Sequence, residues 1–195
     1  AVKEKGYKWF DDSNNKGYDV NIVGVRNAET KDRITNKFDD CVTVSYKKEG
    51  EWKFFCFGAT TDPGDDYMDN PIVEEKGCAI LKEGQYRGSH KIRLHGGKYP
   101  ALGQKKDVTV YRDKNKDGKY DFDESKSDTG LFGINIHRAT SRAGKTSTYV
   151  DKWSAGCQVI ASNDDWTKFL KICEKAKDIH GNSFSYTLLN SKDIC

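Results

Sequence analysis

A histidine and a cysteine stand twenty residues apart in the chain and together could carry out nucleophilic catalysis. His137 ends the segment Gly-Ile-Asn-Ile-His, and Cys157 ends the turn-like segment Trp-Ser-Ala-Gly-Cys. A cysteine attacks carbonyl groups as a thiolate, and a histidine is the usual base that takes its proton. The neighbouring Gly156 lets the backbone approach a substrate carbonyl, where an oxyanion hole would be needed. This pair is therefore our candidate nucleophile and base.

Strands are predicted on both sides of this pair. Alternation of apolar and polar residues predicts a strand over residues 129–137. His137 then lies on the face opposite the apolar row, where a cleft could be. A short strand over residues 159–160 follows Cys157. Three aromatic residues are predicted either in the core or in the wall of this cleft: Trp9, Tyr99 and Trp153.

Further short strands are predicted along most of the chain. They cover residues 18–25, 41–46, 52–57, 77–81, 84–86, 91–95, 107–112 and 184–189. Residues 47–50 are expected to connect two of them as a hairpin. If Tyr46 pairs with Glu51, Cys41 falls opposite Cys56. This leaves two interpretations, a cross-strand disulfide or two small buried thiols.

One amphipathic helix is predicted near the C-terminus. Ser162 is typical of an N-cap, and Asp165 stands where a capping box has its acid. Apolar residues then follow helical spacing: Trp166, Phe169, Leu170, Cys173 and Ala176. Cys173 is therefore expected in the core. Many strands and one helix favour a mainly β fold, a sandwich or barrel, as a single catalytic domain over residues 1–195. Residues 1–40 are expected to form an N-terminal extension or a strand packed on it.

Composition narrows the class of protein. The net charge of +3 is too small to indicate nucleic-acid binding, although it suits an anionic polymer such as a bacterial wall. No apolar run reaches the ~20 residues of a membrane span. Six cysteines are too few for a disulfide scaffold. The sequence shows neither a signal peptide nor an initiating Met, which indicates a processed or trimmed product.

The histidine-to-cysteine segment resembles the catalytic domain of L,D-transpeptidases. That family has a histidine, a short spacer and then Ser-His-Gly-Cys. Here sixteen residues separate His137 from Ser154-Ala155-Gly156-Cys157. Residues 60–64, Thr-Thr-Asp-Pro-Gly, are weakly similar to the family's upstream proline-glycine turn. The resemblance implies a mainly β domain of the L,D-transpeptidase type.

The resemblance also implies a role for each residue of this segment. Cys157 would be the nucleophile and His137 its base, with the backbone carbonyl of Arg138 orienting the ring. The amides of Gly156 and Cys157, in the turn begun by Ser154, would hold the oxyanion. Residues nearby are expected to contact the substrate: Asn135, Trp153, Ala155 and His95.

The implied substrate is an amide of a peptidoglycan stem peptide, attacked by Cys157 to form a thioester. An amine would resolve the thioester in cross-linking, and water in hydrolysis. The implied protein is a monomer that needs no cofactor for catalysis and works in the periplasm or cell wall, or is secreted or phage-delivered. Two departures concern substrate contacts: Ala155 replaces the family's second histidine, and Gln158-Val159 replaces a hydrophobic-arginine pair.

Other interpretations remain open. A hydrolytic relative, such as a wall-degrading L,D-carboxypeptidase or endopeptidase, fits the same residues, and so does a calcium-stabilised binding module without enzyme activity. Cys157 with His180 and Asn182 has the order of papain-like peptidases, but their histidine normally lies more than about a hundred residues further on. His90 and His95 lack a third zinc ligand, so they are predicted as surface or cleft histidines.

A second pattern lies at residues 113–124, which are predicted to form a calcium-loop-like insertion. Its spacing is that of an EF-hand loop, with glycine at the sixth position. The candidate ligands are Asp113, Asn115, Asp117, Lys119 through its carbonyl, Asp121 and Glu124. The alternative is a plain Asx and glycine turn between strands. A bound Ca²⁺ would be structural and would stiffen the loop that leads to the His137 strand.

Overall fold

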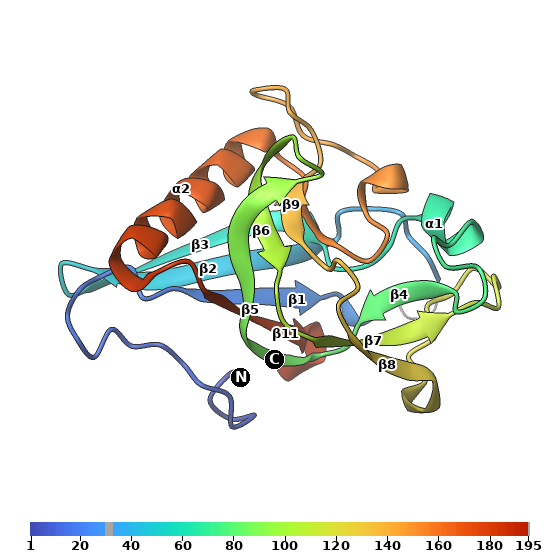
Figure 1. The fold of residues 1–195 in the computed structure, drawn as a ribbon, viewed down its shortest axis with the longest axis horizontal. Helices are drawn as coiled ribbons and strands as arrows, with labels where there is room; N and C mark the ends of the chain where they lie inside the picture. Colours follow the sequence, from blue (N-terminus) through green and yellow to red (C-terminus); the bar gives the residue numbers. More distant parts are fainter. Residues whose placement is uncertain (30–32, 195) are drawn as a thin grey trace.

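The computed structural model describes residues 1–29 and 33–194, and within them eight strands close into a barrel (Figure 1). The order around the barrel is β1-β11-β5-β6-β9-β10-β3-β2, and β4-β7-β8 form a separate small sheet at one side. The predicted mainly β class, with a helix near the C-terminus, is confirmed. The described residues include no helix that is both long and apolar enough to cross a membrane.

The elements have the following bounds. The barrel strands are β1 (Asn21–Arg26), β2 (Asp40–Lys48), β3 (Glu51–Thr60), β5 (Gly84–His95), β6 (Tyr99–Gln104), β9 (Ile136–Arg138), β10 (Gln158–Ile160) and β11 (Phe184–Asn190). The small sheet consists of β4 (Cys78–Leu81), β7 (Val108–Asp113) and β8 (Ser127–Gly130). The helices are α1 (Asp65–Asp69) and α2 (Asn163–His180), and short 3-10 turns occupy Glu124–Lys126, Asp151–Trp153 and Ser191–Asp193.

Helix α2 lies across the barrel and begins where the sequence predicts. The amide of Asp165 donates to Oγ of Ser162 at 3.3 Å, so the N-cap is confirmed. The predicted apolar stripe is also confirmed, with Cys173 fully buried. Phe169 meets Phe57 of β3 edge-on, with 6.0 Å between the ring centroids. Burial of such side chains stabilises the fold by about 1.5–3 kcal/mol each, so this stripe fastens the helix to the barrel.

The β2–β3 hairpin turns more tightly than predicted. Glu49 and Gly50 both have positive φ, 54° and 81°, as a two-residue hairpin turn requires. Lys48 therefore pairs with Glu51 and Tyr46 with Lys53, so the condition that would have placed Cys41 opposite Cys56 is not met. The turn has two residues instead of the predicted four, because Lys47 and Lys48 continue the pairing of β2 with β3.

In this register Cys41 and Cys56 do not lie directly opposite each other. Cys41 pairs with Gly58, and Cys56 pairs with Thr43. Both cysteines are free thiols that lie as diagonal neighbours within hydrogen-bond reach, Cys41 half-buried and Cys56 exposed. The structure therefore has two free thiols here, and the interpretation that both are buried is wrong because Cys56 is exposed.

The predicted strand over residues 129–137 is in fact two strands in different sheets. Strand β8 ends at Gly130 in the small sheet, and β9 begins at Ile136 in the barrel. The connecting residues 131–135 are irregular, and Gly133 has a positive φ of 76°. The alternation continues through this segment because one side of it still packs on the core, but the backbone leaves one sheet for the other.

Candidate active site

Two adjacent parallel strands bring the candidate pair together. His137 of β9 pairs with Val159 of β10, and Cys157 stands two residues before Val159. Because side chains alternate along a strand, Cys157 points to the same side of these strands as Val159 and His137. The barrel order, which sequence patterns could not supply, therefore makes neighbours of the two candidate residues.

The Cys157 thiol is held by the irregular segment before β9. It donates to the carbonyl oxygen of Gly133 at 3.3 Å, and Sγ accepts from the amide of Asn135 at 3.5 Å. Burial raises the pKa of the thiol to about 11, so the resting side chain is uncharged. The hydrogen bonds of Sγ among the described residues are therefore to Gly133 and Asn135, and none is to His137.

The His137 ring is fixed in the tautomer that a base needs. Nδ1–H donates to the carbonyl oxygen of Arg138 at 2.9 Å, which leaves Nε2 as the acceptor. The hydroxyl of Tyr99 lies 3.4 Å from Nδ1, and the His95 ring stacks on the imidazole at 4.3 Å between centroids. His137 is only 4% exposed, and this burial lowers its pKa to about 4. The imidazole is therefore neutral at pH 7 and able to accept a proton.

The turn before Cys157 is shaped by a buried serine. Oγ of Ser154 donates to the carbonyl of Cys157 at 2.8 Å and accepts from the amide of Gly156 at 3.1 Å. Gly156 has a φ of 118°, and a Cβ there would lie 2.2 Å from the carbonyl oxygen of Ala79. Because its amide is already used, Gly156 is a poor oxyanion donor. The Cys157 amide has no partner among the described residues and is the better candidate.

The two residues after Cys157 have no exposed surface that a substrate could touch. Gln158 and Val159 are both fully buried. The Gln158 side chain accepts from the Tyr186 hydroxyl at 2.7 Å and donates to the carbonyls of Thr61 and Gly156 at 3.3 and 3.2 Å. The expectation that positions 158 and 159 shape substrate contacts is wrong. Gln158 supports the turn from behind instead.

Two buried side chains that sequence reasoning did not assign to the site hold residues 131–135. Oε1 of Gln104 accepts from the amides of Phe132 and Ile134 at 3.2 and 2.9 Å. Nε2–H of His90 donates to the carbonyl of Ile134 at 2.9 Å, and Nδ1 accepts from the Ser89 hydroxyl at 2.8 Å. Burial lowers the pKa of His90 to about 4. The expectation of a surface or cleft histidine at position 90 is wrong.

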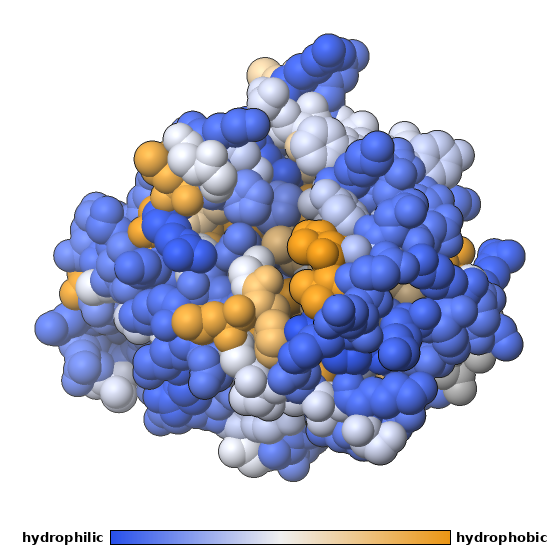
Figure 2. All heavy atoms as spheres, turned by 45° about the vertical axis from the view of Figure 1, so that its right-hand side comes forward, coloured by the Kyte–Doolittle hydropathy of each residue, from blue (hydrophilic) through white to orange (hydrophobic). Residues whose placement is uncertain are grey.

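A groove of about 540 Å³ opens beside His137. Its wall contains Tyr99, His95 and the half-exposed Trp153, and the Arg138 guanidinium lies over the Tyr99 ring at 4.3 Å. The described wall carries three cationic side chains and no carboxylate: Lys98, Arg138 and Lys152. Sequence reasoning missed both lysines because isolated surface lysines carry no pattern. Figure 2 shows apolar side chains gathered near the middle of a largely hydrophilic face of the molecule.

The other residues expected to contact the substrate are partly engaged within the protein. Oδ1 of Asn135 accepts from the amide of Gln104 at 2.9 Å, and its Nδ2 lies 3.3 Å from Nδ1 of His95. Ala155 is half-buried in the turn. The Asn135 side chain therefore connects the Gln104 backbone to the His95 ring. His95 lines the groove, and Asn135 does not.

The predicted calcium loop is closed by hydrogen bonds of its own. Oδ2 of Asp113 accepts from the amide of Asp121 at 2.9 Å, and the Asn115 side chain donates to Asp121 at 3.0 Å. Oδ1 of Asp117 accepts from the amide of Lys119 at 3.0 Å. Burial, together with the nearby Asp121 and Asp117 carboxylates, raises the pKa of Asp113.

Glu124 points away from this loop. Its carboxylate binds the ammonium group of Lys82 and accepts from the hydroxyl of Tyr111 at 3.2 Å. Calcium binding stays a prediction, and it requires Glu124 to turn or to be replaced by water. Within the described residues, one group of three acids comes close enough to share an ion: Asp65, Asp66 and Asp151. Asn36 already donates to two of these carboxylates.

The papain-like alternative has its side chains engaged elsewhere. Nε2–H of His180 donates to the carbonyl of Gly17 at 2.7 Å. The Asn182 side chain is bonded to both backbone groups of Ile92, at 2.7 and 3.0 Å. Neither residue lines the groove beside His137. The structure therefore favours His137 over His180 as the partner of Cys157.

No family model, curated protein or solved structure matches the chain.

Proposed function

We propose that this protein is a cysteine acyltransferase of the L,D-transpeptidase type that acts on peptidoglycan stem peptides. The observation that carries the proposal is the His137 tautomer. Its Nδ1–H is committed to the Arg138 carbonyl, so the nitrogen that faces away from that carbonyl can accept the Cys157 proton. The place of action would be the periplasm or cell wall, or outside a producing cell.

The chemistry begins from a neutral pair. As Sγ of Cys157 bonds to the carbonyl carbon of the substrate, its proton passes to Nε2 of His137. The amide of Cys157 donates to the developing oxyanion. The C–N bond then breaks, the leaving amine takes the proton from His137, and a thioester remains on Cys157. An incoming amine or water breaks the thioester and returns the proton to sulfur.

The charge of the groove supports this substrate class. Lys98, Arg138 and Lys152 all line it, and of the three only Lys152 has an ion pair with a described residue, a long one of 3.9 Å with Asp66. Stem peptides carry carboxylates, which bind such cations by charge-assisted hydrogen bonds. Trp153, which is 45% exposed, adds an apolar surface for the rest of the peptide.

A carbapenem tests the nucleophile, because ring opening by Cys157 leaves a stable acyl group. Intact-protein mass spectrometry is expected to show one adduct on the native protein and on Cys56→Ala, and none on Cys157→Ala. Cys56 is the matched control because, of the five cysteines that the structure describes, its thiol is the exposed one. His137→Gln is expected to slow the reaction by about a hundredfold or more. An adduct that follows Cys56, or none at all, would refute the proposal.

Digestion of purified muropeptides separates transfer from hydrolysis. A cross-linked dimer in the mass spectrum identifies an amine acceptor, as proposed here. Shortened monomers alone identify the hydrolytic alternative, in which water resolves the same thioester. Products that also form with Cys157→Ala would show that the cysteine is not the nucleophile.

A further inference from the structure

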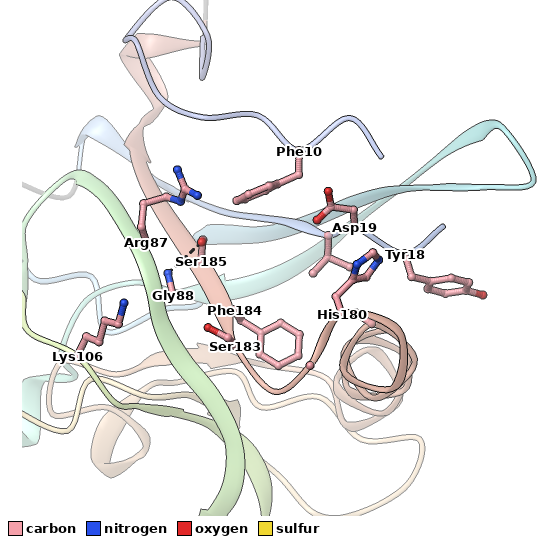
Figure 3. A pocket seen from close by; sticks show the side chains of 13 residues that line it. Phe10, Tyr18, Asp19, Arg87, Gly88, Lys106, His180, Ser183, Phe184 and Ser185 are labelled. Carbon is pink, nitrogen blue, oxygen red and sulfur yellow. Dashed lines mark hydrogen bonds between the residues drawn. The ribbon is translucent and has the colours of Figure 1, made fainter. Parts of the chain in front are cut away.

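A second cavity lies away from the groove beside His137 (Figure 3). It has a volume of about 320 Å³ and sits between the end of α2, the start of β11 and the first half of β5. It shares no lining residue with the groove. Its apolar floor consists of the buried side chains of Val20, Ala176 and Phe184.

An irregularity in the barrel opens this cavity. Strand β11 pairs with β5 at Tyr186–Tyr86 and again at Phe184–His90, so a longer stretch of β5 stands opposite Ser185. Bulges of this kind bend a strand and re-aim its side chains. Gly88, in the middle of the bulge, has a positive φ of 57°, and its amide donates to Oγ of Ser185 at 3.0 Å.

The bulge leaves the Gly88 backbone open to the cavity. A Cβ at Gly88 would lie 3.1 Å from Oγ of Ser183 and 3.5 Å from Nζ of Lys106. These hydroxyl and ammonium groups therefore gather around one point beside a backbone without a side chain. The Ser185 hydroxyl accepts from the Gly88 amide and still has its own proton to donate.

Two cations at this cavity lack a carboxylate partner. Neither Arg87 nor Lys106 forms an ion pair with any described residue, and the Arg87 guanidinium lies over the ring of Phe10 at 5.2 Å. In Figure 3 both enter from the β5 side. Asp19 and His180 lie on the opposite side. Asp19 is therefore separated from the two cations by the width of the cavity, and burial raises its pKa.

We propose that this cavity binds the phosphate group of a small phosphate or phosphoester. Arg87, Lys106 and the hydroxyls of Ser183 and Ser185 come from three separate segments and line the same cavity, with both cations on its β5 side. Such an arrangement suits a tetrahedral oxyanion, whereas a planar carboxylate is best held by one forked donor. The apolar floor leaves room for the organic part of an ester. The proposal does not rest on the activity of Cys157.

Amide chemical shifts of the full chain test the site directly. Titration with inorganic phosphate or glycerol phosphate, at constant ionic strength, is expected to shift the amides of Gly88, Ser183 and Ser185 with a saturating curve. Arg87→Gln and Lys106→Gln are each expected to weaken binding by about tenfold or more. The control is Lys171→Gln, which removes the same charge from an exposed position of α2 outside the cavity.

The two phosphate probes distinguish the sources of the ligand. Tighter binding of glycerol phosphate identifies an ester whose organic part uses the apolar floor, and equal binding identifies free phosphate. Acetate serves as the carboxylate probe, and binding as tight as that of phosphate would overturn the proposal. It would also be overturned if no amide at the cavity shifted with saturation, or if Lys171→Gln weakened binding as much as the cavity variants.

Discussion

Burial moves the pKa values of the catalytic candidates in opposite directions, and both shifts favour the uncharged forms. The Cys157 thiol has its pKa raised to about 11, and the His137 imidazole has its pKa lowered to about 4. These shifts disfavour a resting thiolate–imidazolium pair, so in the proposed reaction the proton moves while the S–C bond forms. The proposal is therefore general-base catalysis by a neutral histidine.

The pH dependence of acylation follows from the His137 pKa. Protonation removes the base, so the carbapenem acylation rate is expected to fall only as the pH drops toward about 4, with a flat region between the two pKa values. An ordinary histidine would give a midpoint near pH ~6.5. Stopped-flow or mass measurement of the rate gives the profile, and circular dichroism at each pH shows whether the fold persists. A midpoint near that of an ordinary histidine would contradict the assignment.

Gly156 allows a sharp test of the turn that presents the nucleophile. Gly156→Ala forces a Cβ to within 2.2 Å of a backbone oxygen at a φ of 118°, and it is expected to lower the free energy of unfolding by about 2 kcal/mol or more. Gly144→Ala is the control, because Gly144 also has positive φ, 68°, but nothing lies within 4 Å of its Cβ position. Urea denaturation compares the two. Equal losses would mean that strain alone, and not the contact with Ala79, makes glycine necessary.

Elements whose signals are local were predictable from the sequence. The Ser162 cap and the apolar spacing after it located α2, and alternation located the β2–β3 hairpin, although not its register. Residues 131–135 were not predictable, because their hydrogen-bond partners are Gln104 and His90 on distant strands. The histidine and the cysteine of the site were found by motif. The groove lysines, Lys98 and Lys152, were not, because they lie in turns outside the strands and isolated surface lysines carry no pattern.

The loop over residues 113–124 is predicted to bind a calcium ion. Burial and the nearby Asp121 and Asp117 carboxylates raise the pKa of Asp113, and a calcium ion would neutralise these acids. Saturating Ca²⁺ is therefore expected to raise the Tm by about 5 °C. The shift should disappear in Asp117→Ala and persist in Asp123→Ala, whose side chain is in the loop but outside the ligand positions. No shift in the native protein would show that the loop is a plain turn.

Closure of the barrel is a property of the whole molecule. Strand β1 pairs in parallel with β11, which joins Ile22 to Tyr186 across most of the chain. Such a pairing between distant strands carries no local signature in the sequence. Strand β5 contributes to both candidate sites. His95 at one end lines the groove, and Arg87 near the other end lines the second cavity. Between them, His90 holds the segment beside Cys157.

One buried guanidinium ties the barrel to the small sheet. Arg26 of β1 is 1% exposed and pairs with Asp62 at 2.8 Å and Glu83 at 2.9 Å. The same group donates to the carbonyls of Thr61 and Leu81, at 3.2 and 2.8 Å, which follow β3 and end β4. Its removal leaves the buried Asp62 carboxylate without its cation. Arg26 is therefore expected to contribute far more to stability than the ion pairs at the surface.

Arg26→Met is expected to lower the free energy of unfolding by about 3–5 kcal/mol at pH 8, because the Asp62 carboxylate stays buried without a partner. Burial already raises the pKa of Asp62, and loss of Arg26 raises it further, so protonation relieves the unpaired charge as the pH falls. The loss should therefore be smaller at pH 5 than at pH 8. Urea denaturation at both pH values measures it, with Lys53→Met, which breaks the exposed pair with Glu51, as the nearly neutral control. A loss that matched this control, or one that grew on acidification, would contradict the role given to Arg26.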